Sequence, residues 1–181
     1  MKTYLETFLL RYLWSLLPLL LLLALWLNGM FDRKQVATIS LSATALVALL
    51  LHEGYRDNAY TPLAGDVPTI GFGTTSGVKL GDRTTPEKAL TVALLDVQKF
   101  EGAIKECVTV PLTQYEYDAF VSLSYNIGSN AFCRSTLVKR LNEGQYAEAC
   151  NQILRWDQFK GKPLAGLTKR RQEEHKKCLG L

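Results

Sequence analysis

The hydrophobic pattern of the chain begins with a long uncharged segment. The twenty residues from Tyr12 to Phe31 carry no charge, and ten of the sixteen from Tyr12 to Leu27 are leucine. Twenty residues in a helix span about 30 Å, which matches the hydrocarbon core of a bilayer. Trp14 and Trp26 lie near the two ends of the segment, where aromatic side chains favour the membrane interface. The pattern therefore predicts a transmembrane helix over residues 12–31.

A cleavable signal peptide is the alternative interpretation of this segment. The apolar region of a signal peptide is normally only about 7–15 residues long, and small residues precede the cleavage site. Here the apolar run is longer, and the sequence 28–31, Asn-Gly-Met-Phe, lacks that small-residue pattern. We therefore expect an uncleaved anchor and junction over residues 1–35, followed by one folded domain over residues 36–181.

The rest of the chain shows helical periodicity with recognisable start signals. Ser40 or Ser42 can cap the first helix. Thr85-Pro86-Glu87 is typical of a helix start, with a cap, a proline and an acid in order. Thr113 with Glu116 forms a capping-box pattern. The expected helices are 43–55, 86–106, 113–125, 135–141, 145–156 and 166–178.

Strand signals are confined to one short region. Pro62, Gly65 and Pro68 enforce turns, and Thr69–Phe72 alternates like a strand. We expect a small β-hairpin lobe that runs on from this strand to about Val78. The predicted fold class is thus α+β and mainly helical, with a cleft between the β lobe and the helical lobe.

Size and charge narrow the classes of partner. After the apolar segment, about 150 residues remain, which is enough for one domain with a substantial core. The net charge is +4, and the segment from Arg155 to the C-terminus has eight Lys and Arg against three acids. A basic surface favours polyanions such as nucleic acid, anionic lipid or wall polymer. A solvated helix face explains the same charge equally well, and no nucleic-acid-binding motif accompanies it.

The four cysteines favour disulfides over a metal site. None of Cys107, Cys133, Cys150 and Cys178 forms a CxxC motif, and the chain has only two histidines. In an exported chain an even number suggests two disulfides, with three possible connectivities. Cys133 and Cys150 flank an expected helical hairpin, so we pair these two and, by elimination, Cys107 with Cys178. Free thiols in a reducing compartment are the alternative.

The chemistry is concentrated between His52 and Thr75. Glu53 ends an apolar helix, Asp66 follows in a Pro/Gly-rich turn, and Thr69 opens the strand. Two carboxylates on different elements suit hydrolysis of a glycosidic bond, in which one protonates the leaving oxygen and the other activates water. Asp66 can equally serve as an ordinary turn residue that accepts backbone hydrogen bonds. Gly71 and Gly73 would allow close backbone approach in the cleft.

This order of residues resembles the phage-type lysozymes, glycoside hydrolase family 24. In that family a Glu ends the first helix, an acid or Cys follows nine residues later, and a Thr before Ile-Gly-x-Gly comes six further on. Here Pro62 stands nine residues after Glu53, and Thr69 stands sixteen after it. Asp66 is the nearest acid able to replace the missing one. Further similar stretches are Leu112–Phe120, Tyr125–Gly128, Ser135–Leu137 with Leu141-Asn142, Trp156, Pro163–Leu167 and Arg170-Arg171 with Glu174.

The resemblance implies a lysozyme-like two-lobed fold and a cofactor-free, metal-free muramidase. Glu53 would be the general acid, Asp66 the base and Thr69 the residue that holds the attacking water. Asn126 would bind sugar or merely cap a helix. Such an enzyme cleaves peptidoglycan, the bond between N-acetylmuramic acid and N-acetylglucosamine, and lyses the bacterial host. We expect a monomer, held in the host inner membrane with its catalytic domain in the periplasm.

Three alternatives follow from the same residues. Some endolysins of this family use a signal-arrest-release segment that later leaves the bilayer, but the leucine-rich segment here makes release costly. If Glu53 is the only acid, a lytic transglycosylase is expected instead of a hydrolase. If Pro62 has removed catalysis, the chain is a membrane-anchored protein that binds the wall without cleaving it.

Overall fold

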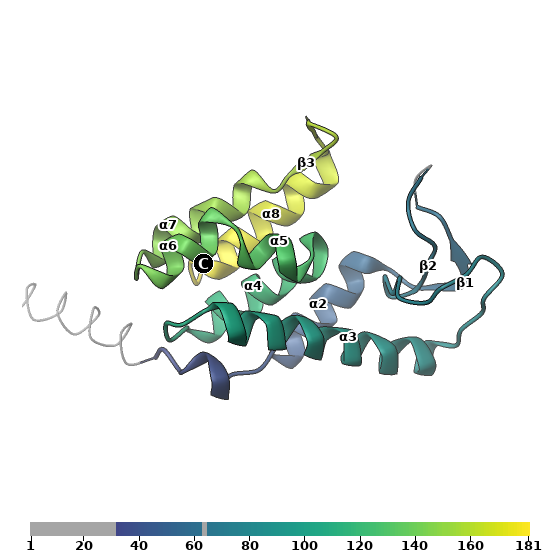
Figure 1. The fold of residues 1–181 in the computed structure, drawn as a ribbon, viewed down its shortest axis with the longest axis horizontal. Helices are drawn as coiled ribbons and strands as arrows, with labels where there is room; N and C mark the ends of the chain where they lie inside the picture. Colours follow the sequence, from purple (N-terminus) through teal and green to yellow (C-terminus); the bar gives the residue numbers. More distant parts are fainter. Residues whose placement is uncertain (1–31, 63–64) are drawn as a thin grey trace, which may run out of the picture. The chain divides into compact units, whose positions relative to one another are not determined.

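The computed structural model describes residues 32–62 and 65–181 of the chain. It divides into two compact units, Met1–Lys34 and Gln35–Leu181, and every helix and strand named below lies in the second unit (Figure 1). In the described ranges, no helix has both the length and the apolar composition that a membrane crossing requires. The anchor predicted over residues 12–31 lies outside the described residues and stays a prediction.

The second unit is mainly helical, with two small sheets of two strands each. This agrees with the predicted fold class. In chain order the elements are η1 (Val36–Thr38), α2 (Ala43–Glu53), β1 (Arg56–Tyr60), β2 (Thr69–Gly71), α3 (Pro86–Cys107), α4 (Gln114–Ile127), α5 (Ser129–Cys133), α6 (Thr136–Asn142), α7 (Tyr146–Gln152), η2 (Ile153–Arg155), β3 (Gln158–Phe159), β4 (Lys162–Pro163) and α8 (Ala165–Cys178).

The helices begin at the capping residues that the sequence predicts. Ser42 caps α2 by accepting a hydrogen bond from the Ala45 amide, and Thr85 caps α3 in the same way. The capping box of Thr113 and Glu116 is present at α4. These side chains satisfy amides that have no partner inside the helix, so the local sequence is sufficient to fix each start.

The hairpin differs from the prediction. Strand β2 pairs antiparallel with β1, which precedes it, through Arg56–Gly71 and Tyr60–Thr69. We expected the hairpin to continue after Thr69 to about Val78, and this was wrong. The segment after β2 turns back at once, because Ile70 and Thr74 exchange backbone hydrogen bonds. Strand β1 is polar and mostly exposed, so it has no hydrophobic alternation to reveal it.

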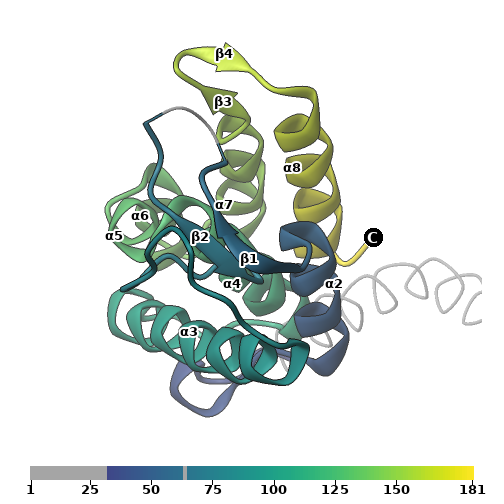
Figure 2. The same cartoon turned by 90° about the vertical axis from the view of Figure 1, so that its right-hand side faces the viewer.

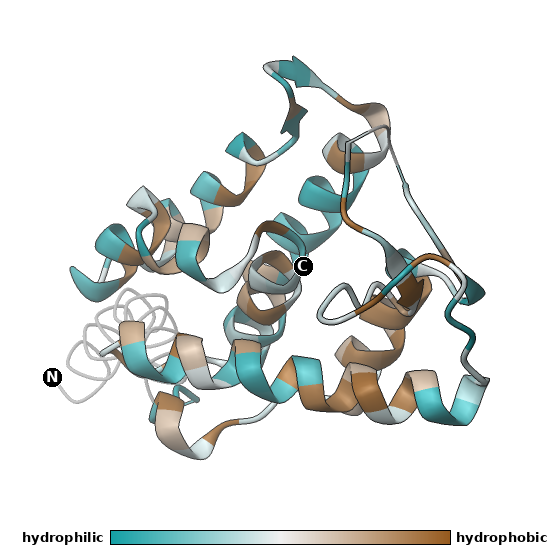
Figure 3. Ribbon diagram, turned by 45° about the vertical axis from the view of Figure 1, so that its right-hand side comes forward, coloured by the Kyte–Doolittle hydropathy of each residue, from teal (hydrophilic) through white to brown (hydrophobic). Residues whose placement is uncertain are grey.

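Helix α4 lies in the middle of the domain, between α3 and α8 (Figure 2). The long helix α3 carries hydrophobic and hydrophilic residues in alternating bands, as expected for a helix with one face on the core (Figure 3). Asp118 on α4 is almost fully buried and accepts hydrogen bonds from the backbone amide and hydroxyl of Ser42, at 3.0 and 2.5 Å. These bonds hold the start of α2 against α4 and therefore set the position in space of its last residue, Glu53.

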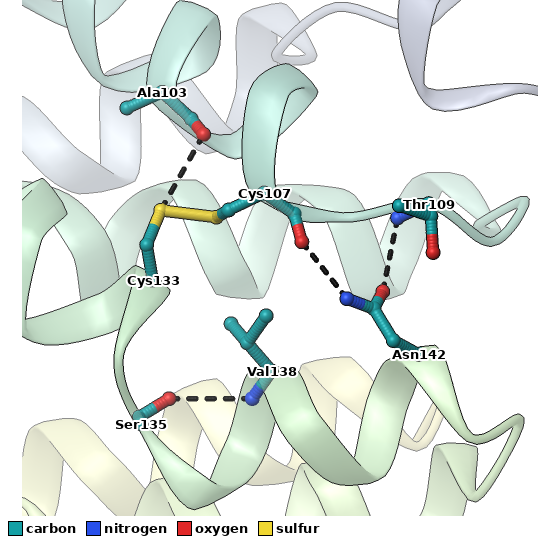
Figure 4. The surroundings of a disulfide bond; sticks show 7 residues. All are labelled: Ala103, Cys107, Thr109, Cys133, Ser135, Val138 and Asn142. Carbon is teal, nitrogen blue, oxygen red and sulfur yellow. Dashed lines mark hydrogen bonds between the residues drawn. A yellow bond between two sulfur atoms is a disulfide. The ribbon is translucent and has the colours of Figure 1, made fainter.

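Two disulfides are present, as predicted, but with different partners. Cys107 at the end of α3 is bonded to Cys133 at the end of α5, and Cys150 of α7 to Cys178 of α8. The predicted pairs, Cys133–Cys150 and Cys107–Cys178, are wrong, because α5 returns to the end of α3 while α7 packs against α8. Asn142 secures the first bridge by bonding to the Cys107 carbonyl and the Thr109 amide (Figure 4).

Candidate active site

A cavity of about 590 Å³ lies beside the end of α2. Its walls come from four parts of the chain that are distant in sequence: the end of α2, the turn after β2, the middle of α3, and the end of α4 with the start of α5. The lining residues are Glu53, Gly73, Thr75, Ser76, Asp96, Lys99, Phe100, Tyr125, Asn126, Ile127, Gly128 and Ser129. The cavity is therefore a product of the tertiary fold.

Glu53 is the last residue of α2 and forms part of the cavity wall. The helix ends here because Gly54 adopts a positive φ of 68°, a conformation that glycine takes without strain. The Glu53 side chain is only 18% exposed, and its Oε1 lies 2.8 Å from Nη1 of Arg170. A carboxylate with so little access to water needs such a partner.

Arg170 is itself held in place on α8. It is 7% exposed, its Nε lies 3.1 Å from Oε1 of Glu174, and its Nη2 donates to the Ser122 carbonyl at 3.3 Å. The Ser122 hydroxyl donates to the same Glu174 oxygen at 2.7 Å. The guanidinium is thus fixed by Glu174 on its own helix and by Ser122 on α4 before it meets Glu53. We did not assign Arg170 a role from the sequence; an Arg four residues before a Glu on one helix is the signal it offered.

Gly73 and Gly71 are both required as glycines, for different reasons. A Cβ on Gly73 would lie 3.0 Å from Oε2 of Glu53, and the residue has φ +87°. A Cβ on Gly71 would lie 2.9 Å from the Ala89 Cβ on α3. Gly73 therefore lets the chain approach the Glu53 carboxylate, whereas Gly71 lets β2 pack against α3. Only Gly73 lines the cavity.

Asp66 and Thr69 lie outside the lining of the cavity. Asp66 is exposed in the connection between β1 and β2. Thr69 is 7% exposed, and its hydroxyl donates to the Val67 carbonyl at 3.2 Å. Of the residues predicted for the site, the structure brings Glu53, Gly73 and Asn126 together around the cavity. The roles of Asp66 and Thr69 stay predictions.

Asp96 is a second cavity carboxylate that the sequence analysis missed. It lies on α3 with a side chain 14% exposed; its Oδ1 accepts from Lys99 at 2.9 Å and its Oδ2 from Thr74 at 3.0 Å. A signal was present in the sequence: Asp96 follows the buried Ala93 by three residues, on the same face of the helix. An acid at that spacing points toward the domain interior.

Tyr125 joins the helical part of the domain to the turn that carries Gly73. Its hydroxyl donates to the Phe72 carbonyl at 3.0 Å, and its ring packs against Phe100 with centroids 4.9 Å apart. Burial raises the pKa of Tyr125, and the negative charges of Glu53 and Asp96 raise it further. The hydroxyl therefore keeps its proton at neutral pH and remains a donor.

Comparison with known proteins identifies the family to which the chain is similar. The family model described as phage lysozyme matches residues 51–174. The SAR-endolysin of Pseudomonas phage phiKMV is 39% identical over 141 residues, which are 76% of this chain and 87% of that protein. The family match includes Glu53 and the residues that surround it.

Solved structures agree with the sequence matches. The endolysin from Escherichia coli O157:H7 phage FAHEc1 is 37% identical, with a TM-score of 0.69 over 81% of this chain and 96% of that one. The muramidase domain of SpmX from Asticaccaulis excentricus is 33% identical, with a TM-score of 0.70 over 77% and 97%. With its lysozyme-like helical fold, its small antiparallel hairpins and Glu53 at the cavity, this chain belongs to the phage lysozyme family and is a glycoside hydrolase that acts on peptidoglycan.

Proposed function

We propose that this chain is an endolysin muramidase that hydrolyses the β-1,4 bond between N-acetylmuramic acid and N-acetylglucosamine. The observation that carries the proposal is the carboxyl group of Glu53, which lines the cavity and is held at 2.8 Å by Arg170. A relative with a solved structure is itself described as a muramidase domain. Cleavage of this bond throughout the wall would lyse the bacterial host.

In the proposed reaction, Glu53 is protonated on Oε2 while Oε1 accepts from Arg170. It donates that proton to the glycosidic oxygen while the bond from that oxygen to C1 breaks. Water attacks C1 from the opposite face of the sugar ring and gives a proton to a second carboxylate. The products are a free hydroxyl on one sugar and a new reducing end on the other, with the anomeric centre inverted. Arg170 holds the Glu53 carboxyl in one orientation throughout, which saves the cost of ordering it during the reaction.

Asp66 is the carboxylate that we propose as the base, with Thr69 holding the water. Asp66 is exposed, so water and substrate can reach it, and it precedes Thr69 by three residues. Asp96 is the competing candidate because it lines the cavity with Glu53. Both oxygens of Asp96 already accept hydrogen bonds, from Thr74 and Lys99, which favours a structural role for it.

A lytic transglycosylase is the second candidate function. It is favoured by the position of Asp66 outside the cavity lining, since Glu53 would then act as the only acid. In that reaction the C6 hydroxyl of the muramic acid attacks C1 in place of water, and a 1,6-anhydro sugar forms. The third possibility, a wall-binding protein without catalysis, is not retained because the chain matches the phage lysozyme family and its relatives are endolysins.

Mass spectrometry of digested peptidoglycan tests the proposal. The full-length chain, purified in mild detergent, should release fragments with reducing ends. Fragments with 1,6-anhydro ends would instead establish a transglycosylase. In either case Glu53→Gln should reduce the rate by at least about 100-fold, the usual contribution of a general acid. Full activity of that variant would refute both mechanisms.

We also propose that residues 12–31 anchor the chain, as a monomer, in the host inner membrane with the enzyme in the periplasm. The leucine-rich sequence, the disulfides and the SAR-endolysin relative support this location, because disulfides persist in oxidising compartments. The alternative to a permanent anchor is later release of the chain from the membrane as a soluble form. Fractionation of expressing cells distinguishes the two, since an anchored chain sediments with membranes and a released chain does not.

A further inference from the structure

We infer that Arg171 is a positioning residue that turns the amide group of Asn126 toward the cavity, so that Asn126 recognises the carbonyl oxygen of an N-acetyl group on the glycan. Arg171 lies on α8 and Asn126 near the end of α4. The inference rests on the proposed function, because it names the part of the sugar that the same cavity would select.

The contact between the two residues is short, and it joins a buried residue, Arg171, to an exposed one, Asn126. Nη2 of Arg171 lies 2.7 Å from Oδ1 of Asn126. Arg171 is fully buried, with 0% exposure, and its charge is balanced by Glu174, whose Oε2 lies 3.2 Å from its Nε. Burial restricts the guanidinium, and because its Nε and Nη1 make no hydrogen bond within the described residues, the Asn126 oxygen is the acceptor available to it. It therefore presents a fixed hydrogen-bond donor to Asn126.

This donor decides which way the Asn126 amide faces. A guanidinium has five N–H donors and no acceptor. The oxygen of Asn126 must therefore face Arg171, because the opposite rotation would bring two donor groups together. The amide NH₂ group then occupies the other side of the side chain. Asn126 is exposed and lines the cavity that contains Glu53, so its NH₂ group is available to a bound sugar.

The chemistry of the sugar identifies the matching group. An NH₂ group donates hydrogen bonds and accepts none, so it requires an acceptor on the substrate. Each amino sugar of peptidoglycan carries one N-acetyl group, whose carbonyl oxygen is an acceptor only. Without the acetyl group the sugar has an ammonium, which is a donor and a cation. That group would meet the NH₂ of Asn126 with one donor facing another.

The variant Asn126→Asp separates recognition from folding. Aspartate has nearly the same shape, and it keeps an oxygen for Arg171, but it has no donor to offer the sugar. The measurement is kcat/KM on N-acetylated peptidoglycan and on the same material after chemical de-N-acetylation. We expect the preference of the wild type for the acetylated wall to fall by up to about tenfold, the value of one hydrogen bond, mainly through KM.

Asn130→Asp is the matched control. Asn130 is exposed, lies four residues further along the chain and is outside the cavity lining. It introduces the same charge, so a general electrostatic effect on the substrate would alter the preference in both variants. An unchanged preference in Asn126→Asp, or an equal loss in Asn130→Asp, would overturn the inference.

Arg171→Gln tests the positioning role separately. Glutamine can offer Asn126 either a donor or an acceptor, so the amide of Asn126 would no longer be held in one orientation. The acetyl preference should fall, whereas Arg171→Lys, which keeps a donor-only cation, should retain it. If neither variant folds, the Asn126→Asp result still decides the inference. A wild-type chain that cleaves neither wall would refute the proposed function instead, so the two failures are distinguishable.

Discussion

Nη1 of Arg170 lies 2.8 Å from Oε1 of Glu53, although 117 residues separate them in the sequence. This ion pair joins the last helix to the end of the first long helix of the domain. It links the integrity of α8 to the orientation of the proposed catalytic acid. The stability of the domain and its activity should therefore respond together to changes at Arg170.

Arg170→Met should destabilise the domain and reduce activity. The variant leaves Glu53 without its partner and Glu174 with Arg171 and the Ser122 hydroxyl. Loss of one partner of a buried pair costs about 3–5 kcal/mol. Arg140→Met is the control, because Arg140 and Glu143 are 46% and 41% exposed at 3.7 Å. Such a surface pair contributes about 0–1 kcal/mol. Urea denaturation and a wall-lysis assay check both effects; equal stability losses in the two variants would contradict the prediction.

Gly73→Ala should lose activity beyond what its stability loss explains. The new Cβ would lie 3.0 Å from Oε2 of Glu53 and displace the carboxyl group. Gly77→Ala is matched for backbone strain, since Gly77 has φ +74° and no atom within 4 Å of the added Cβ. Both variants should lose about 1–2 kcal/mol of stability. Only Gly73→Ala should also reduce kcat, by at least about tenfold, as measured on isolated wall.

Asp66→Asn and Asp96→Asn should fail in different ways. If Asp66 is the base, its variant loses at least about 100-fold in kcat with an unchanged melting temperature. Asp96→Asn should mainly lose stability, by about 1–3 kcal/mol, because Thr74 and Lys99 lose a charged acceptor. Near-full activity of Asp66→Asn beside an inactive Glu53→Gln would show that Asp66 is not the base.

The buried tyrosines should make the domain sensitive to alkaline pH. Burial raises the pKa of Tyr117 and Tyr125 above the ordinary value of 10.0. Above pH about 10 these groups lose protons in the unfolded chain before they do so in the folded one, so stability is complete below that pH and falls as pH rises. Tyr125→Phe should reduce this fall. Urea denaturation between about pH 9 and 11 measures it, and an identical slope in the variant would refute the assignment.

Each disulfide should contribute about 3–4 kcal/mol, from loops of 26 and 28 residues. Cys150→Ser should also reduce activity more than Cys133→Ser, because Cys150 secures α8, which carries Arg170. Thermal melts and lysis assays of both variants test this. Peptide mapping without reduction checks the pairing itself; a cross-linked peptide that contains Cys133 and Cys150 would contradict it.

The sequence by itself determined the local features of this protein. Ser42, Thr85 and Thr113 satisfy the first amides of their helices from within a few residues, so the helix starts could be predicted. The same holds for Glu53, whose position before Gly54 and near the Thr69–Gly73 stretch carries the family resemblance. These features depend on residues that are close together in the chain, and for that reason they can be predicted from the sequence.

The tertiary structure alone decided how distant segments meet. Packing between helices and strands far apart in sequence decided three features. These are the pairing of the cysteines, the pairing of β1 with the strand that contains Thr69, and the position of the Asp96 carboxylate at the cavity. The contacts of Arg170 with Glu53 and of Arg171 with Asn126 are of the same kind. Buried charges must find partners wherever the fold brings them, and no local pattern specifies which residue that partner is.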